Sequence, residues 1–268
     1  MDDIARFLRI WDLTTFYPVI FQVSVADISE DEKLQIFDLV KSYIVRREVC
    51  GLTSKNYNNV VQRCTQRLNK TGANAANLLA LFNEMEGDAT RFPSDEEVVK
   101  RFSLRSIYGS IPTPRLRFGL EAIEHKKRTK FDESVMATVI PTVEHIMPQH
   151  WAEKWPLPDG TWAPCESQIT AMIVHKADPA IQELIGTREQ LVGSIGNLTL
   201  VTAALNPSMG NESFGEKKTQ LSASLLVLNR EIGAHETWDE KTICRRGVEL
   251  AELCTDLWPA TLKIAVEA

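Results

Sequence analysis

The pattern of this chain changes at a short basic run, Lys126-Lys127-Arg128-Thr129-Lys130, and this change constrains the fold more than any other feature. Before the run, apolar residues recur at helical spacing, and after it short β-branched segments occur. We therefore expect a mainly α protein in two parts. A helical scaffold or docking region occupies residues 1–130, and an α+β domain with a small strand-strand-helix element occupies residues 131–268.

Five helices are predicted in the first part. Ser29 and Glu32 form a capping box, and the helix after them places apolar residues at helical intervals up to Arg46-Arg47 (Leu34, Phe37, Val40 and Ile44). A second helix begins near Thr53-Ser54, and its apolar side ends before Gly72 (Tyr57, Val60, Val61, Cys64 and Leu68). A third helix covers about Ala73 to Met85. A fourth begins at Ser94, and a fifth begins at Thr113-Pro114. By themselves these helices indicate only scaffolding or docking.

The second part alternates strands and helices. Val135–Ile140 is compact and β-branched, Thr142–Ile146 continues it as an extended edge, and Leu198–Val201 is a second short strand. Leu205-Asn206-Pro207 is a typical helix start, and apolar residues at helical intervals from Trp238 to Trp258 close the core.

Between the two predicted strands lies a long irregular region, which is uncommon unless it is functional. Helical stretches are expected over about 166–175 and 179–185. Trp151, Trp155 and Trp162 either pack this loop or stack on unpaired bases.

Composition excludes several classes of protein. Hydrophobic residues at 44% and charged residues at 25% are typical of folded domains, and a chain of 268 residues can bury two modest cores. No apolar run is long enough to span a membrane and the N-terminus is acidic, so we expect a cytoplasmic protein. The five scattered cysteines contain no Cys-x-x-Cys pair, which favours reduced thiols. A net charge of −6 argues against coating nucleic acid, so any binding of nucleic acid would need a local basic groove or a partner domain. The basic run is either a solvated linker or a DNA contact.

The chemistry of the chain concentrates at Glu144-His145, Gly196-Asn197-Leu198 and Asn206. An imidazole with an ordinary pKa of about 6.5 can deprotonate water, while carboxylate and amide oxygens favour Mg²⁺ or Mn²⁺ over zinc. Adjacent strand residues point to opposite sides, so Glu144 and His145 serve one site only if the strand ends or twists there. Together these residues indicate a one-metal phosphodiesterase centre.

These residues resemble the HNH, or ββα-metal, endonucleases. The narrower resemblance is to the C-terminal nuclease region of GmrSD-like type IV modification-dependent restriction enzymes. It is specific in the nuclease half (Val143 to Gln149, Ile195 to Leu200, Asn206, Asn211, Phe214, Lys217 and Lys218) and looser upstream (Tyr43 to Leu52 and Arg91 to Asp95).

The resemblance implies a role for each candidate residue. His145 is the catalytic base, and Asn197 is a backbone-holding amide that braces the histidine loop. Glu144 and Asn206 are metal ligands, with Asn211 as an alternative or additional ligand. Candidate substrate-binding residues are Lys217 and Lys218, together with His150 in the long loop.

The expected function is a metal-dependent DNA endonuclease that acts as the effector part of a restriction or antiphage system. In the enzymes that the chain resembles, an N-terminal NTPase-like domain supplies nucleotide-dependent control. Since no nucleotide-binding motif is visible here, the resemblance implies that such a domain or subunit is a partner absent from this chain. A catalytically silent helical adaptor and an RNase with the same centre remain the alternatives.

Overall fold

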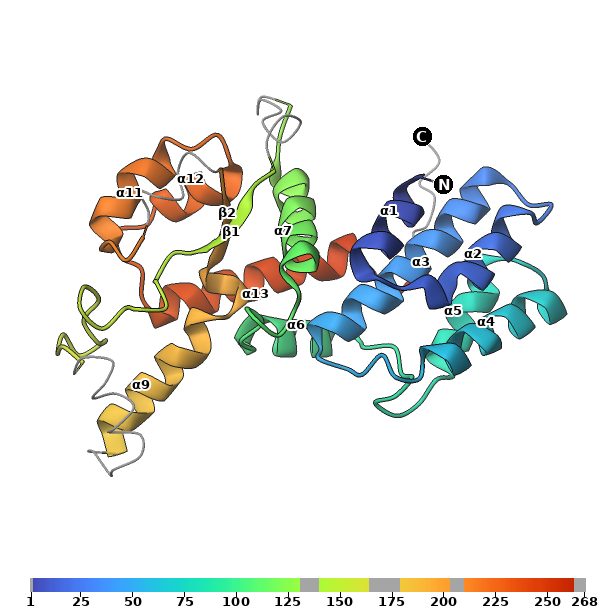
Figure 1. Cartoon of the computed structure of the whole chain (residues 1–268), viewed down its shortest axis with the longest axis horizontal. Helices are drawn as coiled ribbons and strands as arrows, with labels where there is room; N and C mark the ends of the chain where they lie inside the picture. The colour runs from blue at the N-terminus through green and yellow to red at the C-terminus, as the bar shows by residue number, and fades with distance from the viewer. Residues whose placement is uncertain (1, 131–139, 164–178, 203–209, 263–268) are drawn as a thin grey trace. The chain divides into compact units, whose positions relative to one another are not determined.

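A computed structural model describes residues 2–130, 140–163, 179–202 and 210–262 (Figure 1). In these residues the protein is mainly helical, with a two-stranded antiparallel sheet, as predicted. The chain divides into two compact units: Met1–Arg101 with Cys254–Ala268, and Phe102–Leu253. This division falls earlier than the boundary expected near Lys130, because helix α7 (Thr113–Lys127) packs on the sheet of the second unit.

The first unit is built from helices whose starts the sequence encodes. Ser29 caps α3 by accepting the Glu32 N–H at 3.2 Å, and Gly72 ends α4 with a positive φ of 94°. The five residues predicted for the inner side of α4 are its buried residues. The elements of this unit are α1 (Asp2–Trp11), η1 (Thr14–Phe16), α2 (Tyr17–Ser24), α3 (Glu30–Val49), α4 (Tyr57–Thr71), α5 (Ala75–Asn83) and α6 (Asp95–Leu104), the last divided between the units.

Not every residue of the apolar repeat in α3 is buried. Phe37, Val40 and Ile44 lie in the core, but Leu34 is 52% exposed. The helix instead buries Ile36 beside Phe37, and towards its C-terminal end it is buried on nearly every side. The inner face therefore begins one turn later than the apolar repeat suggested.

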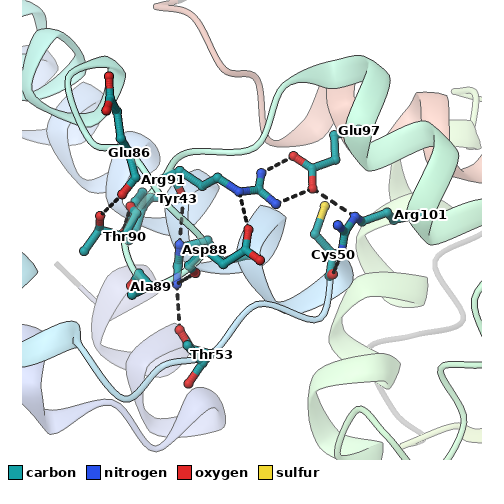
Figure 2. Close-up of polar contacts among 11 residues, drawn as sticks. Tyr43, Cys50, Thr53, Glu86, Asp88, Ala89, Thr90, Arg91, Glu97 and Arg101 are labelled. Atoms are coloured by element: carbon teal, nitrogen blue, oxygen red, sulfur yellow. Dashed lines mark hydrogen bonds and ion pairs between the residues drawn. The ribbon is translucent and has the colours of Figure 1, made fainter.

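Two adjacent buried arginines of α3 anchor the segment that precedes α6. Arg47 donates to the carbonyl oxygens of Arg91 (2.7 Å), Thr53 (2.6 Å), Asp88 (3.1 Å) and Ala89 (3.0 Å). Figure 2 shows the ion pairs around Arg91, which binds Asp88 and Glu97.

Arg46, the neighbour of Arg47 on α3, extends the same anchoring along the chain. It donates to the carbonyl oxygen of Pro93 at 3.0 Å and pairs with Asp95. The two upstream stretches that carried the family resemblance therefore pack together as one structural feature.

The second unit places its sheet among helices. Strands β1 (Thr142–His145) and β2 (Leu198–Val201) pair antiparallel, with Glu144 opposite Thr199 and His145 opposite Leu198. In Figure 1 the strands stand between α7 and the pair α11–α12, and both α7 and α12 contact β2. The remaining elements are α9 (Pro179–Val192), η2 (Ile195–Asn197), α11 (Phe214–Ser222), α12 (Val227–Gly233) and α13 (Glu240–Leu257), which also crosses the unit boundary.

The core of the second unit settles the role of two tryptophans. Trp151 and Trp155 are buried at 1% and 4% exposure in a cluster with Phe214, Trp238 and other apolar residues, so they pack the loop. Trp162 is 60% exposed.

Several predicted elements lie outside the described residues: the strand over 135–140 except its last residue, the helix over 166–175, and the helix start at 205–207. Among the described helices, none is long and apolar enough to cross a bilayer.

Candidate active site

His145 is the last residue of β1. The strand therefore ends at the Glu144-His145 pair, which is one of the two conditions under which both side chains could serve one site. Its side chain is buried, and its ring meets the Tyr108 ring edge to face, with centroids 4.3 Å apart. The covered Nε2 atom has no hydrogen-bond partner among the described residues. Burial, and secondarily the charge of Lys217, lowers the pKa of His145 to about 4, so the imidazole is neutral at pH 7.

Asn197 joins the start of β2 to the chain that follows His145. Its Oδ1 accepts the Met147 N–H at 2.8 Å, and its Nδ2 donates to the Met147 carbonyl at 2.8 Å and the Val192 carbonyl at 2.9 Å. The indole of Trp238 also donates to Oδ1 at 3.0 Å. These are the contacts of a backbone-holding amide, and a buried amide with every group bonded fixes the loop in one position.

Lys217 was predicted as a substrate-binding residue, but in the structure it contacts the protein backbone. It is fully buried, and its Nζ donates to the carbonyl oxygens of Ile146 at 2.8 Å and His145 at 3.2 Å. A capping box of Ser213 and Glu216 starts α11 and brings this lysine to the end of β1. Burial lowers the pKa of Lys217 to about 8.

Glu144 is the carboxylate nearest these groups in the chain. It is half-buried, and burial raises its pKa while the charge of Lys217 opposes the rise. The Glu144 carboxylate is the type of oxygen ligand that Mg²⁺ or Mn²⁺ prefers, and His145 Nε2 is a buried nitrogen with no hydrogen-bond partner among the described residues. Within the described residues, however, no group of three or more His, Cys, Asp and Glu forms a cage, so any such ion would need amide or other oxygens as well.

The other predicted site residues are two asparagines, a lysine and a histidine. Asn211 is exposed in the turn before α11, and Asn206 lies outside the described residues. Lys218 is half-buried on α11 and His150 is exposed.

Two members of the basic run are tied into the second unit instead of lining a groove. Lys127 pairs with Glu231 at 2.7 Å, and Arg128 pairs with the buried Glu124 at 2.9 Å.

Sequence reasoning missed two residues that shape the site. Tyr108, which covers His145, carried no motif. Arg246 of α13 is buried and donates through Nη1 to the carbonyl oxygens of Gly196 (2.7 Å) and Leu198 (2.8 Å), on either side of Asn197. The glycine before Asn197 was the one sequence clue to this close contact with α13. A Cβ on Gly196 would lie 2.0 Å from the Ile243 carbonyl oxygen, so only glycine lets the turn approach α13 this closely.

Comparison with known proteins identifies the class. Residues 92–253 match the family described as "GmrSD restriction endonucleases, C-terminal domain". Because this match covers more than half of the sequence, the chain belongs to that family, and its second unit is a restriction-endonuclease type of nuclease domain. No curated protein matches the chain.

Proposed function

We propose that this protein is a metal-dependent DNA endonuclease of the HNH type, with His145 as its base. One observation carries the proposal: in a chain of a restriction-endonuclease family, a neutral buried histidine ends a strand whose next residues are held by the side chain of Asn197.

The chemistry required of His145 is removal of one proton from water. As the water oxygen attacks phosphorus, its proton passes to the neutral imidazole, and the bond from phosphorus to the departing sugar oxygen breaks. A phosphate brought beside the ring favours the imidazolium form, which raises the pKa of His145 and strengthens it as a base. Asn197 contributes by keeping the backbone after His145 in place.

The metal, when bound, would stabilise the negative charge that develops on the phosphate and on the leaving oxygen. Glu144 would hold it with Asn206 or Asn211, since these are the oxygen donors that the family resemblance assigns. Lys218 and His150 are proposed phosphate contacts. In the cell we propose a cytoplasmic effector of a restriction or antiphage system, joined to an NTPase-like domain or subunit.

Plasmid nicking in Mg²⁺, in Mn²⁺ and in EDTA tests the proposal. We expect the wild type to nick supercoiled DNA only with metal, and His145→Ala to lose at least about 100-fold in rate, the scale of general-base catalysis. The matched control is His125→Ala, which removes an exposed histidine of α7. Equal nicking by wild type and His145→Ala contradicts the assignment.

The same assay separates the alternatives. Absence of cleavage on every nucleic acid favours the silent adaptor, and cleavage confined to RNA favours the RNase. The metal ligands are tested by the metal concentration that each variant needs for cleavage. The variants are Glu144→Ala, Asn206→Ala and Asn211→Ala. An asparagine whose loss does not raise this concentration is not a ligand.

A further inference from the structure

Two buried cations hold the backbone at the site end of the sheet. Lys217, from α11, bonds the two carbonyls of His145 and Ile146 at the end of β1. Arg246, from α13, bonds the carbonyls of Gly196 and Leu198 at the start of β2. Between them, the side chain of Asn197 ties the two chain segments together.

Neither cation forms an ion pair with a described residue. Arg188 of the same unit provides the contrast, because it is also buried and also bonds two carbonyls, those of Trp155 and Pro156, but it pairs with Glu240 at 2.6 Å. Burying a charge without an opposite partner is costly, and an apolar side chain of similar volume would avoid that cost. A structural role alone therefore accounts poorly for a lysine at position 217.

We propose, building on the nuclease function above, that Lys217 is a positioning residue for His145 and that Arg246 is the matching positioning residue for Asn197. In this proposal neither cation binds the substrate. Each fixes carbonyl groups next to a site residue, so that the imidazole keeps one orientation toward the phosphate. Catalysis is sensitive to such placement, because a displacement of about 1 Å can cost about 100-fold in rate.

A positioning role for Lys217 and direct phosphate binding by Lys217 predict different kinetic effects. A lysine that contacts the substrate contributes to affinity, so its loss raises KM and weakens the salt dependence. A lysine buried beneath the backbone contributes through geometry in the transition state, so its loss lowers kcat and leaves KM unchanged.

The experiment measures kcat and KM for metal-dependent DNA cleavage by the full chain and four variants. Lys217→Met keeps the length of the side chain and removes the charge, while Lys217→Arg keeps the charge. Arg246→Met makes the same test on the other strand. Arg188→Met removes a buried cation that bonds the Trp155 and Pro156 carbonyls and neither strand end, so it gives the effect of losing a buried cation from another part of the unit. Rates are normalised to the folded fraction.

We expect Lys217→Met and Arg246→Met to lower kcat by about 10- to 100-fold with KM within about twofold of wild type, a loss typical of residues that orient site ligands. Lys217→Arg should recover at least about half of that loss on a logarithmic scale. A raised KM with unchanged kcat, or a loss no larger than that of Arg188→Met, overturns the proposal.

A second readout does not depend on cleavage. The ring protons of His145 lie against the Tyr108 ring, so their NMR frequencies report the placement of the imidazole. We expect these frequencies to move in Lys217→Met and to stay near wild type in Lys217→Arg and Arg188→Met. Unchanged frequencies in a folded Lys217→Met overturn the proposal even if the wild type cleaves nothing. If Lys217→Met does not fold, unchanged His145 frequencies in a folded Arg246→Met overturn it. An inactive wild type with moved frequencies contradicts only the nuclease function.

Discussion

At the scale of single residues, the burial of His145 couples its chemistry to the stability of the fold. Water would solvate an imidazolium, whereas this ring is 6% exposed, packs on Tyr108 and lies near the positive charge of Lys217. The folded protein therefore holds His145 in its neutral form, which is the form that can act as a base.

This coupling predicts how stability depends on pH. The pKa of His145 is about 4 in the folded protein and about 6.5 when unperturbed, so between these values the unfolded chain binds more protons. The stability gained from the neutral ring is fully present above about pH 6.5 and is lost as the pH falls toward 4. We expect the wild type to lose about 2 to 3 kcal/mol more than His145→Asn between about pH 7.5 and 4.5, measured by urea denaturation. Parallel losses in the two proteins would contradict the low pKa.

The sequence predicted part of the candidate site. The motifs singled out His145 and Asn197, and in the structure the side chain of Asn197 bonds the backbone of Met147, two residues after His145. The burial of Lys217 was not predictable, because lysines are almost always exposed and nothing near it in the sequence supplies a counter-charge inside the core. Tyr108 was missed because it reaches His145 from a distant part of the chain.

At the scale of elements, the turn before β2 is set by its fit against α13. The Cα of Gly196 lies so close that a methyl group would meet the Ile243 carbonyl at 2.0 Å and the Gly247 nitrogen at 3.0 Å, both of them backbone atoms of a helix. Neither can move aside without displacing α13, so this turn, and Asn197 after it, depends on glycine.

Gly196→Ala is therefore expected to destabilise the protein by about 1 to 3 kcal/mol, the usual cost of overpacking, and to reduce nicking by displacing Asn197. Gly186→Ala is the matched control, because it lies inside α9 with no atom within 4 Å of its Cβ position and should be neutral or stabilise by up to about 1 kcal/mol. Thermal denaturation and nicking of both variants measure these effects. A Gly196→Ala protein as stable and active as Gly186→Ala would contradict the close packing.

The anchor on α3 gives a second prediction at this scale. Arg47→Met leaves four carbonyl acceptors without their donor, so we expect a loss of roughly 3 kcal/mol or more in the free energy of unfolding. Arg67→Met removes an arginine that pairs with Glu84 nearer the surface and should cost about 1 kcal/mol or less. Urea denaturation compares the two, and equal losses would show that Arg47 does not anchor the segment.

Elements with their own start and stop signals were predictable. The inner residues of α4 and the bounds of β2 follow from the sequence. The boundary between the units was not, because α7 reads as one more helix in a series and only its packing assigns it to the second unit. Likewise, nothing local in Arg46-Arg47 indicates that two charged side chains are buried by carbonyls from a segment more than forty residues away.

At the scale of the whole molecule, charge limits how the protein can hold DNA. The net charge is −6, and the basic run that offered the clearest cationic stretch has Lys127 and Arg128 paired with carboxylates. Lys217 and Arg246, which bond the backbone at the candidate site, are buried. We therefore expect few phosphate contacts from these residues, so that DNA binding would need a local basic groove elsewhere or a partner domain.

Few phosphate contacts predict a weak dependence of KM on salt. If the chain neutralises about two phosphates, raising the salt from about 50 to about 200 mM should increase KM only about tenfold, against about a thousandfold or more for proteins with six or more contacts. Lys218→Ala should lower the slope of log KM against log salt concentration by about one if this half-buried lysine binds phosphate. Lys55→Ala removes the same charge from an exposed position in the first unit and should leave the slope unchanged. An equal slope in wild type and Lys218→Ala would remove Lys218 from the substrate site, and a steep slope in the wild type would require a cationic surface that the paired residues of the basic run do not supply.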